Sequence, residues 1–336
     1  MWVGGASLAL TFAMLAGILL MRLLFSRKER RRQWFVAMWR PMFVRGMYKK
    51  PKTLPPLRGS ENMYFLILFN HYHSLVKGEE KAGLNALADV AGIRRFALDA
   101  LKQREMTRKI TAAYALGFMK EPAAFEPLRK EALSENTVLS MAAATAMVYI
   151  DAPLAVRLLL PVFLSRADWP VSACDRLLRE AGKEAVSATL KKAAFESDEA
   201  RAPVVIRLLG AADEETAAEV VRHWLLHGTS DETIASCLQK MKDPRLLGFA
   251  RKHLDHATWY VRLQAVTALG RIGGRGEIGA LTRMLADGEW WVRYRAAQAI
   301  AAMPGMGKDE LDGVMNALTD RFAKDILDHV IAETAK

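Results

Sequence analysis

Cysteine is almost absent from this sequence of 336 residues, which contains only Cys174 and Cys237. Two isolated cysteines, each inside a predicted helix, cannot form the disulfide framework on which small secreted domains depend. The chain therefore suits a reducing, cytosolic setting. Aromatic residues make up 8% of the sequence, whereas hydrophobic residues reach 51%. Alanine and leucine dominate that fraction, so the composition favours helices and is ample for a buried core.

Net charge is also absent from most of the chain, although the whole carries +11. The first 60 residues contain 12 lysines and arginines and one acid, Glu29, which leaves 36 basic and 36 acidic residues in the remainder. A surface that binds duplex nucleic acid needs a concentrated run of cations. We therefore expect no nucleic-acid partner, and we expect residues 22–52 to face an anionic lipid surface.

Motifs that carry catalysis, cofactors or metals are missing as well. His223 and His227 share a helix face, but Trp224 occupies the position at which a zinc protease has its glutamate. The glycine-rich stretch 273–276 lies between two predicted helices, so it indicates a turn and not a phosphate-binding loop. We therefore predict no catalytic residue, no cofactor and no metal, in a protein that is not an enzyme.

Residues 1–21 contain no charged side chain, and the apolar character extends to residue 25. Because about 20 apolar residues span the core of a bilayer as a helix, residues 1–25 are predicted to form a transmembrane helix. A cleavable signal peptide would have its cations ahead of the apolar run, whereas here they follow it. The positive-inside rule then places the N-terminus outside and the rest in the cytoplasm. Small residues line one face, where another membrane helix could approach: Gly5, Ala9, Ala13 and Gly17.

Residues 26–60 form a basic and aromatic segment followed by a linker rich in proline at 51–56. Trp34, Met38 and Trp39 would share one face of a helix, and rings interleaved with arginines suit the headgroup region of a membrane. A short helix packed on the membrane domain of a partner is the alternative. The predicted membrane-interface residues are Arg30, Arg31, Arg32, Trp34, Phe35 and Trp39.

From about residue 104 onward the chain repeats itself. Apolar residues follow the i, i+4, i+7, i+8, i+11 rhythm of an amphipathic helix from Val261, and again from Val292. Glycine follows three of the recurring apolar positions, where we expect it to end the helix. These positions recur in steps of 31, 31, 31, 29, 31 and 31 residues, at Leu116, Met147, Leu178, Leu209, Leu238, Leu269 and Ile300.

Each predicted repeat consists of a first helix, a short turn and a second helix. Neighbouring repeats must stack, because one such pair cannot bury its own apolar face. Residues 104–322 are predicted to hold seven repeats. Residues 61–103 would supply N-terminal capping helices, and residues 323–336 a C-terminal capping helix. The predicted fold class is all-α, a solenoid of helix pairs preceded by a single transmembrane helix.

These repeats resemble HEAT repeats, in the compact bacterial variety also called phycobilisome-lyase-type repeats. The resemblance rests on the Val-Arg pairs at 261–262 and 292–293, on the Ala-Leu-Gly sequences at 115–117 and 268–270, and on the tryptophan ahead of each Val-Arg pair. It is clearest over residues 255–303. The resemblance implies a right-handed α-solenoid that binds partner proteins along a concave face. Together with the predicted anchor, it implies a location in the bacterial inner membrane.

Tryptophan stands two residues before a valine in three repeats. Because this position recurs with the architecture, packing at the turn is the favoured interpretation, and a partner-binding strip is the alternative. Under that alternative, the candidate partner-binding residues are Trp169, Trp259, Trp290, Trp291, Arg262 and Arg293.

The favoured function is a membrane-tethered scaffold or adaptor that binds partner proteins at the cytoplasmic face of the inner membrane. The alternative is an accessory subunit of a membrane complex, such as a polysaccharide-synthesising glycosyltransferase system. A lyase or a DNA glycosylase built on a HEAT-like fold is a third hypothesis, which a tethered body without net charge disfavours. All three rest on analogy between folds.

Overall fold

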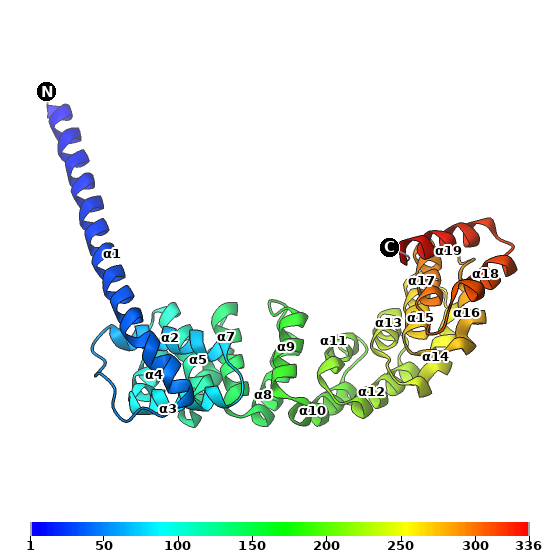
Figure 1. The fold of residues 1–336 in the computed structure, drawn as a ribbon, viewed down its shortest axis with the longest axis horizontal. Helices are drawn as coiled ribbons and strands as arrows, with labels where there is room; N and C mark the ends of the chain where they lie inside the picture. The colour runs from blue at the N-terminus through cyan, green and yellow to red at the C-terminus, as the bar shows by residue number, and fades with distance from the viewer. Residues whose placement is uncertain (1, 335–336) are drawn as a thin grey trace. The chain divides into compact units, whose positions relative to one another are not determined.

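The computed structural model describes the backbone of residues 2–334 and the side chains of residues 14–22, 26–27 and 29–333. Within residues 2–334 every regular element is helical and there is no β-strand. The chain divides into two compact units, Met1–Asp151 and Ala152–Lys336 (Figure 1). The prediction of an all-α fold is therefore confirmed, and the stacked helices of each unit are consistent with an α-solenoid.

Unit 1 begins with one long helix, α1 (Trp2–Tyr48). Local signals set the later helix starts: the Glu121 side chain accepts a hydrogen bond from the Ala123 N–H, and Asn136 caps α7 by accepting one from the Leu139 N–H at 2.9 Å. The remaining helices are α2 (Glu61–Leu75), α3 (Glu79–Val90), α4 (Ile93–Leu101), α5 (Met106–Phe118), η1 (Pro122–Ala124), α6 (Phe125–Ala132) and α7 (Thr137–Ile150).

The aromatic stripe of α1 is buried inside unit 1. Phe35 and Trp39 are at most 1% exposed, and the Trp39 ring meets Phe65 of α2 edge-on, with 5.2 Å between ring centroids. Phe43 continues the stripe and stacks on Tyr72 of α2 at 5.3 Å. The prediction that Phe35 and Trp39 lie at a membrane interface is therefore wrong. The aromatic run of α2 needs an apolar partner, and residues i, i+4 and i+8 of α1 supply it.

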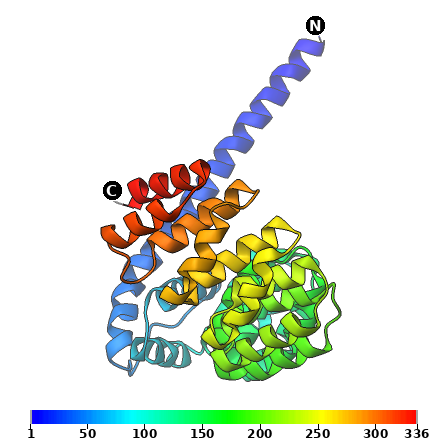
Figure 2. The same ribbon diagram turned by 90° about the vertical axis from the view of Figure 1, so that its right-hand side faces the viewer.

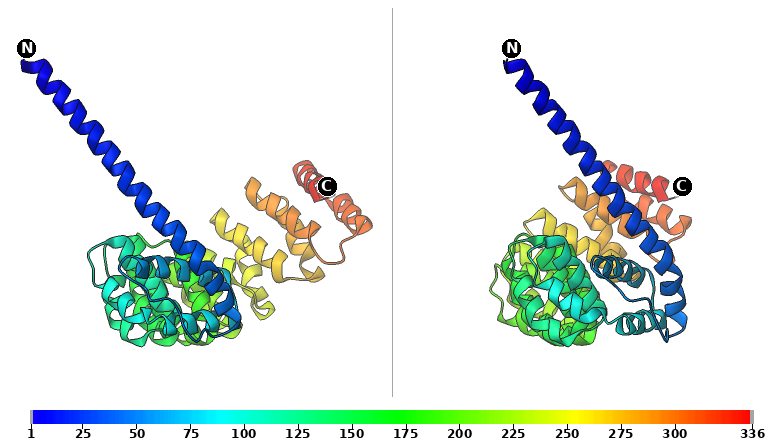
Figure 3. Two further views of the ribbon diagram at one scale, coloured as in Figure 1. Left: turned by 60° about the vertical axis from the view of Figure 1, so that its left-hand side comes forward. Right: turned by 90° about the vertical axis from the view of Figure 1, so that its left-hand side faces the viewer.

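Among the described side chains, no helix offers a stretch long and apolar enough to cross a bilayer. Helix α1 runs unbroken from the apolar N-terminal stretch, through the arginine-rich segment and past Pro41, into the packing of unit 1 (Figures 1 and 3). The lack of such a stretch, together with the continuation of α1 into unit 1, contradicts the predicted location. That prediction was a single-pass protein of the bacterial inner membrane, with the N-terminus outside and the solenoid in the cytoplasm. Of the predicted small-residue face, Gly5, Ala9 and Ala13 lie outside the described side chains.

Unit 2 arranges its helices in rows. The first helices of successive repeats, α9, α11, α13, α15 and α17, pack one on the next and end on α19, while α8, α10 and α12 form a second row beside them (Figures 1 and 2). Helices α14 and α16 cover α15 and α17. The elements are α8 (Ala152–Ser165), α9 (Val171–Ala181), α10 (Lys183–Glu196), α11 (Ala202–Leu208), η2 (Leu209–Ala211), α12 (Glu214–His227), α13 (Asp231–Lys240), η3 (Pro244–Leu246), α14 (Leu247–Lys252), η4 (His253–Asp255), α15 (Trp259–Ile272), η5 (Arg275–Glu277), α16 (Ile278–Met284), α17 (Trp290–Ala301), α18 (Lys308–Ala317) and α19 (Arg321–Thr334).

The recurring apolar positions of the sequence form the spine of this stacking. All seven positions, from Leu116 to Ile300, are at most 2% exposed. They fall in α5, α7, α9, α13, α15 and α17, and in η2, which directly continues α11. The periodicity therefore marks the face that each first helix buries against its neighbours in its own unit.

Two of the glycines that follow this spine lie within their helices and do not end them. A Cβ added to Gly117 of α5 would lie 2.7 Å from the Cα of Ala146 in α7. A Cβ on Gly270 of α15 would overlap the Cβ of Ala299 in α17. The expectation that glycine ends the helix is therefore wrong at both positions. Glycine and alanine at these contacts allow neighbouring first helices to approach more closely than larger side chains would permit.

Burial also perturbs a histidine of unit 1. His73 of α2 is 4% exposed, and its ring stacks on Phe118 of α5 with 4.2 Å between centroids. Burial, followed by the nearby positive charge of Lys81, lowers the pKa of His73 from 6.5 to about 4. The folded protein therefore binds a proton here only at a much lower pH than the unfolded chain does.

Lowering the pH from 8 to 5 is expected to remove about 2 kcal/mol of stability through His73, since only the unfolded chain is protonated there. The loss begins as the pH falls through 6.5, the unfolded pKa, and ends near 4, the folded pKa. Urea unfolding of the full chain at several pH values measures it. The His73→Phe variant should lack this component, whereas His71→Phe, at an exposed position, should keep it. The same pH dependence in all three proteins would contradict the assignment.

Candidate functional site

Helices α15 and α17 each begin with a pair of aromatic residues whose rings are exposed. Trp259 and Tyr260 are 39% and 37% exposed, and Trp290 and Trp291 are 45% and 57% exposed. Trp290 stacks on Tyr294, one turn later, with 4.9 Å between centroids, and meets Trp291 edge-on at 4.8 Å. Because α15 packs against α17, the two pairs start neighbouring helices. These five residues are called the aromatic edge below.

The aromatic edge is braced by the last helix of the chain. The Tyr294 hydroxyl donates a hydrogen bond to Oε2 of Glu333 in α19 at 2.8 Å. That bond to a carboxylate raises the pKa of Tyr294, so the phenol keeps its proton. Since Trp290 stacks on the same phenol ring, its exposed face is held in a defined orientation.

Arg262 and Arg293, the two arginines among the candidate partner-binding residues, form their hydrogen bonds within the repeats. Each guanidinium reaches back to the loop before its own helix: Arg293 donates to the carbonyl oxygens of Asp287 and Gly288 at 2.7 and 3.2 Å, and Arg262 donates to those of residues 256–257 at 2.9 Å. Arg262 also forms a bidentate ion pair with the Asp287 carboxylate at 2.7 and 2.8 Å. These arginines hold the loops that support the aromatic edge.

Trp169 has the same sequence position as Trp259 and Trp290 but a different environment. It is 3% exposed, its ring lies 5.2 Å from that of Phe163 in α8, and the Arg166 guanidinium sits 5.1 Å from its centroid. The structure therefore separates the predicted tryptophan row. Trp169 belongs to the core, and Trp259 and Trp290 stay on the surface.

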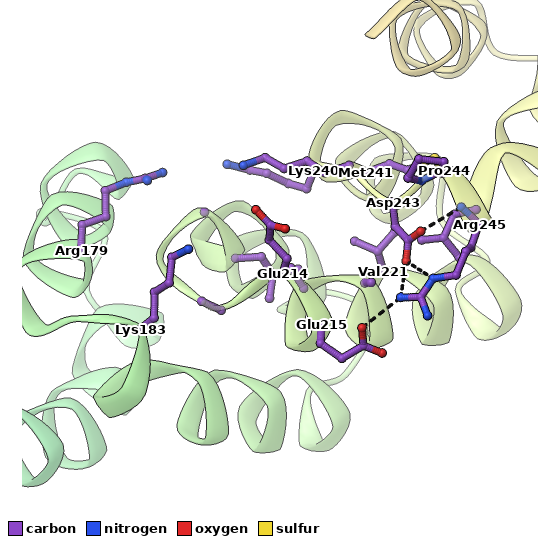
Figure 4. Close-up of a pocket in the computed structure, with 17 residues that line it drawn as sticks. Arg179, Lys183, Glu214, Glu215, Val221, Lys240, Met241, Asp243, Pro244 and Arg245 are labelled. Carbon is purple, nitrogen blue, oxygen red and sulfur yellow. Dashed lines mark hydrogen bonds and ion pairs between the residues drawn. The ribbon is translucent and has the colours of Figure 1, made fainter. Parts of the chain in front are cut away.

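A cleft of about 380 Å³ opens where α9, α11 and α13 end and α10 and α12 begin (Figure 4). We call it the cationic cleft. The side chains of Arg179, Lys183 and Lys240 extend toward a common space, and the Glu214 carboxylate faces the same space (Figure 4). None of these residues was predicted to form a site, because they are scattered over more than 60 positions and only the stacking of three repeats brings them together.

Metal-ligating side chains are not gathered into a site in the described part of the chain. No cluster of three or more histidine, cysteine, aspartate or glutamate residues there could hold a metal ion. Both cysteines are buried and free, and burial raises the pKa of Cys174 to about 11, so its reactive thiolate is disfavoured. Burial and the neighbouring His227 lower the pKa of His223, whose ring lies 4.9 Å from that of His227 on α12.

A comparison with known protein families finds one match. The model of the HEAT-repeat family matches residues 232–301 and 248–334, the part of the chain that carries the aromatic edge, so this part contains HEAT repeats. No curated protein matches the chain. A crystal structure of an engineered protein, a structural-genomics target, is similar to this chain with a TM-score of 0.36 and 14% identity, and the match covers 88% of this chain and 98% of that one.

Proposed function

We propose that this chain is a scaffold whose HEAT repeats bind a partner protein through the aromatic edge. The observation that carries the proposal is the exposure of Trp259, Tyr260, Trp290 and Trp291 on neighbouring helices. Tryptophan and tyrosine dominate the energetically important positions of protein interfaces, because they offer large, stiff apolar surface together with a polar group. A cluster of such rings on a helical surface is unfavourable in water and marks a contact site.

The charge of the N-terminal segment in unit 1 supports a second, separate contact. Residues 22–52 hold nearly all the excess positive charge, and most of their described cationic side chains are exposed. They suit an acidic partner surface, or anionic lipid headgroups contacted from one side. We also propose that the repeats between residues 104 and 231 are HEAT repeats, and that all the repeats are of the phycobilisome-lyase type. In this proposal the chain acts by binding a partner and not by catalysis.

Replacing Trp259 and Trp291 together by alanine should reduce partner recovery at least tenfold, which corresponds to about 1.4 kcal/mol of binding free energy. The measurement is quantitative co-purification with the full-length tagged protein, followed by titration of the purified partner. Phe322→Ala is the matched control, because Phe322 of α19 is an exposed aromatic residue outside the edge. Undiminished binding by the double variant, or an equal loss in the control, would rule out the aromatic edge as the docking surface.

A further inference from the structure

We infer that the cationic cleft of unit 2 binds a small phosphate-bearing molecule with free hydroxyl groups, such as a sugar phosphate. This inference is independent of the proposed scaffold function, because the cleft lies at the turns between first and second helices, whereas the aromatic edge lies at the starts of first helices. A volume of about 380 Å³ falls in the range of small-ligand pockets.

Arg179 is positioned by contacts on both sides of its guanidinium. The Nε of Arg179 donates to Oδ2 of Asp175, one turn earlier in α9, at 2.8 Å, and the two side chains form an ion pair. On the other side the guanidinium lies against Gly210 of η2, where a Cβ would overlap Nη2. Glycine at this position therefore makes room for the arginine, and the group is held at the cleft in a fixed orientation.

Two lysines complete the cation set, and neither has a carboxylate within ion-pair distance in the described part of the chain. Lys183 begins α10 and Lys240 ends α13, and both amino groups extend into the cleft (Figure 4). Lys240 is partly buried, and burial lowers the pKa of its amino group. The negative charge of Asp175 opposes this shift, and the positive charge of Arg179 adds to it. A half-buried ammonium without a partner is costly, and an anion in the cleft would remove that cost.

Arg245 at the far rim of the cleft has two carboxylate partners, whereas Arg179 has one, Asp175, and the two lysines have none in the described part of the chain. Arg245 pairs with Oδ2 of Asp243 at 2.6 Å and with Oε2 of Glu215 at 2.9 Å, so its charge is neutralised from within the fold. The positive charge without an ion-pair partner in the described part of the cleft is thus that of Lys183 and Lys240, and Arg179 adds a guanidinium that one carboxylate orients. An arginine and two lysines converging on one space match the three terminal oxygens of a phosphate monoester.

Glu214 determines the rest of the ligand. Its carboxylate faces the same space and has no hydrogen bond or ion pair in the described part of the chain. A carboxylate repels a bare anion, but it accepts hydrogen bonds from hydroxyl groups. A molecule that places its phosphate on Arg179, Lys183 and Lys240 and its hydroxyls on Glu214 satisfies both kinds of group. A free inorganic anion satisfies only the first.

The test titrates the full-length protein with ribose 5-phosphate, with inorganic phosphate and with ribose, by calorimetry at 150 mM salt. Saturable one-to-one binding of ribose 5-phosphate is expected, at least tenfold tighter than that of phosphate, with no binding of ribose. Lys240→Met, which keeps the apolar stem, should weaken binding at least tenfold. Lys252→Met, at an exposed lysine of α14, should leave binding unchanged.

Glu214→Gln separates the inference from simple charge attraction. Because this variant removes a repulsive charge, it should bind inorganic phosphate more tightly than the wild type does, while its preference for ribose 5-phosphate falls severalfold. Several outcomes would overturn the inference: equal binding by Lys240→Met and wild type, binding that disappears at 150 mM salt, or occupation of the cleft by an acidic peptide and not by the sugar phosphate.

Discussion

Replacing Gly270 by valine is expected to lower the free energy of unfolding of unit 2 by about 3 kcal/mol, the upper part of the range for overpacked cores. Even a single Cβ at Gly270 overlaps Ala299 of α17, and the Ala299 Cα lies only 3.1 Å from it. The neighbour is a helix backbone and cannot rotate away. The helix propensity gained on leaving glycine, at most about 1 kcal/mol, is too small to offset this clash.

Gly313 provides the matched control for this prediction. It lies inside α18, and a Cβ there would have nothing within 4 Å. Gly313→Ala should therefore stabilise the protein by about 1 kcal/mol, with the opposite sign to any change at Gly270. Urea unfolding of the full chain, followed by circular dichroism, measures both variants. If Gly270→Val is as stable as the wild type, the close approach of α15 and α17 is not a property of the protein.

Replacing Asp287 by alanine is expected to destabilise unit 2 by about 3 kcal/mol. The carboxylate is 6% exposed and receives both arms of Arg262, which is 16% exposed. It also accepts a hydrogen bond from the Glu289 N–H at 2.9 Å, at the start of α17. Although burial opposes its charged form, these contacts lower the pKa of Asp287. The variant leaves the largely covered guanidinium of Arg262 without its counter-ion and the start of α17 without the hydrogen bond to Glu289.

A double-mutant cycle with Arg262→Met tests whether the pair acts as one unit. The double variant should be less destabilised than the sum of the two single variants, by 1 kcal/mol or more, because the second substitution removes the charge that the first left unpaired. The control pair is Asp255 with Arg283, in which both side chains are mostly exposed. Asp255→Ala should change stability by no more than about 1 kcal/mol. Additive single effects at Asp287 and Arg262 would show that they do not act together.

The repeat could be predicted from the sequence because its signal is periodic and local. Positions such as Leu116 and Ile300 recur at a nearly constant interval, and a helix face that must be buried leaves that interval in the sequence. The structure buries all of them. What each neighbouring glycine does could not be predicted, because a glycine that ends a helix and a glycine that admits the next helix look the same in one sequence.

The environment of the aromatic residues could not be predicted for a related reason. The segment from Trp34 to Phe43 is rich in apolar residues, so the sequence alone does not show which of two helix faces is the buried one. The aromatic face of α2, about 30 residues later, selects the stripe of Phe35, Trp39 and Phe43 and leaves Trp34 59% exposed. Trp169 and Trp259 likewise share the same local sequence pattern, a tryptophan two residues before a valine. Only Trp169 has Phe163 and Arg166 beside it in the structure.

The row of first helices in unit 2 has a mechanical consequence. Each inner helix of this row packs against the helix before it and the helix after it. The resistance of the unit to deformation is therefore the sum of many small, similar interfaces and does not come from one indivisible core. A destabilising change in α19 would therefore loosen the packing at the end of the row, while the earlier helices stay packed on one another. Small changes in the angle between neighbouring helices, repeated at every interface, would add up to a bend of the whole unit and let it adapt its curvature to a bound partner.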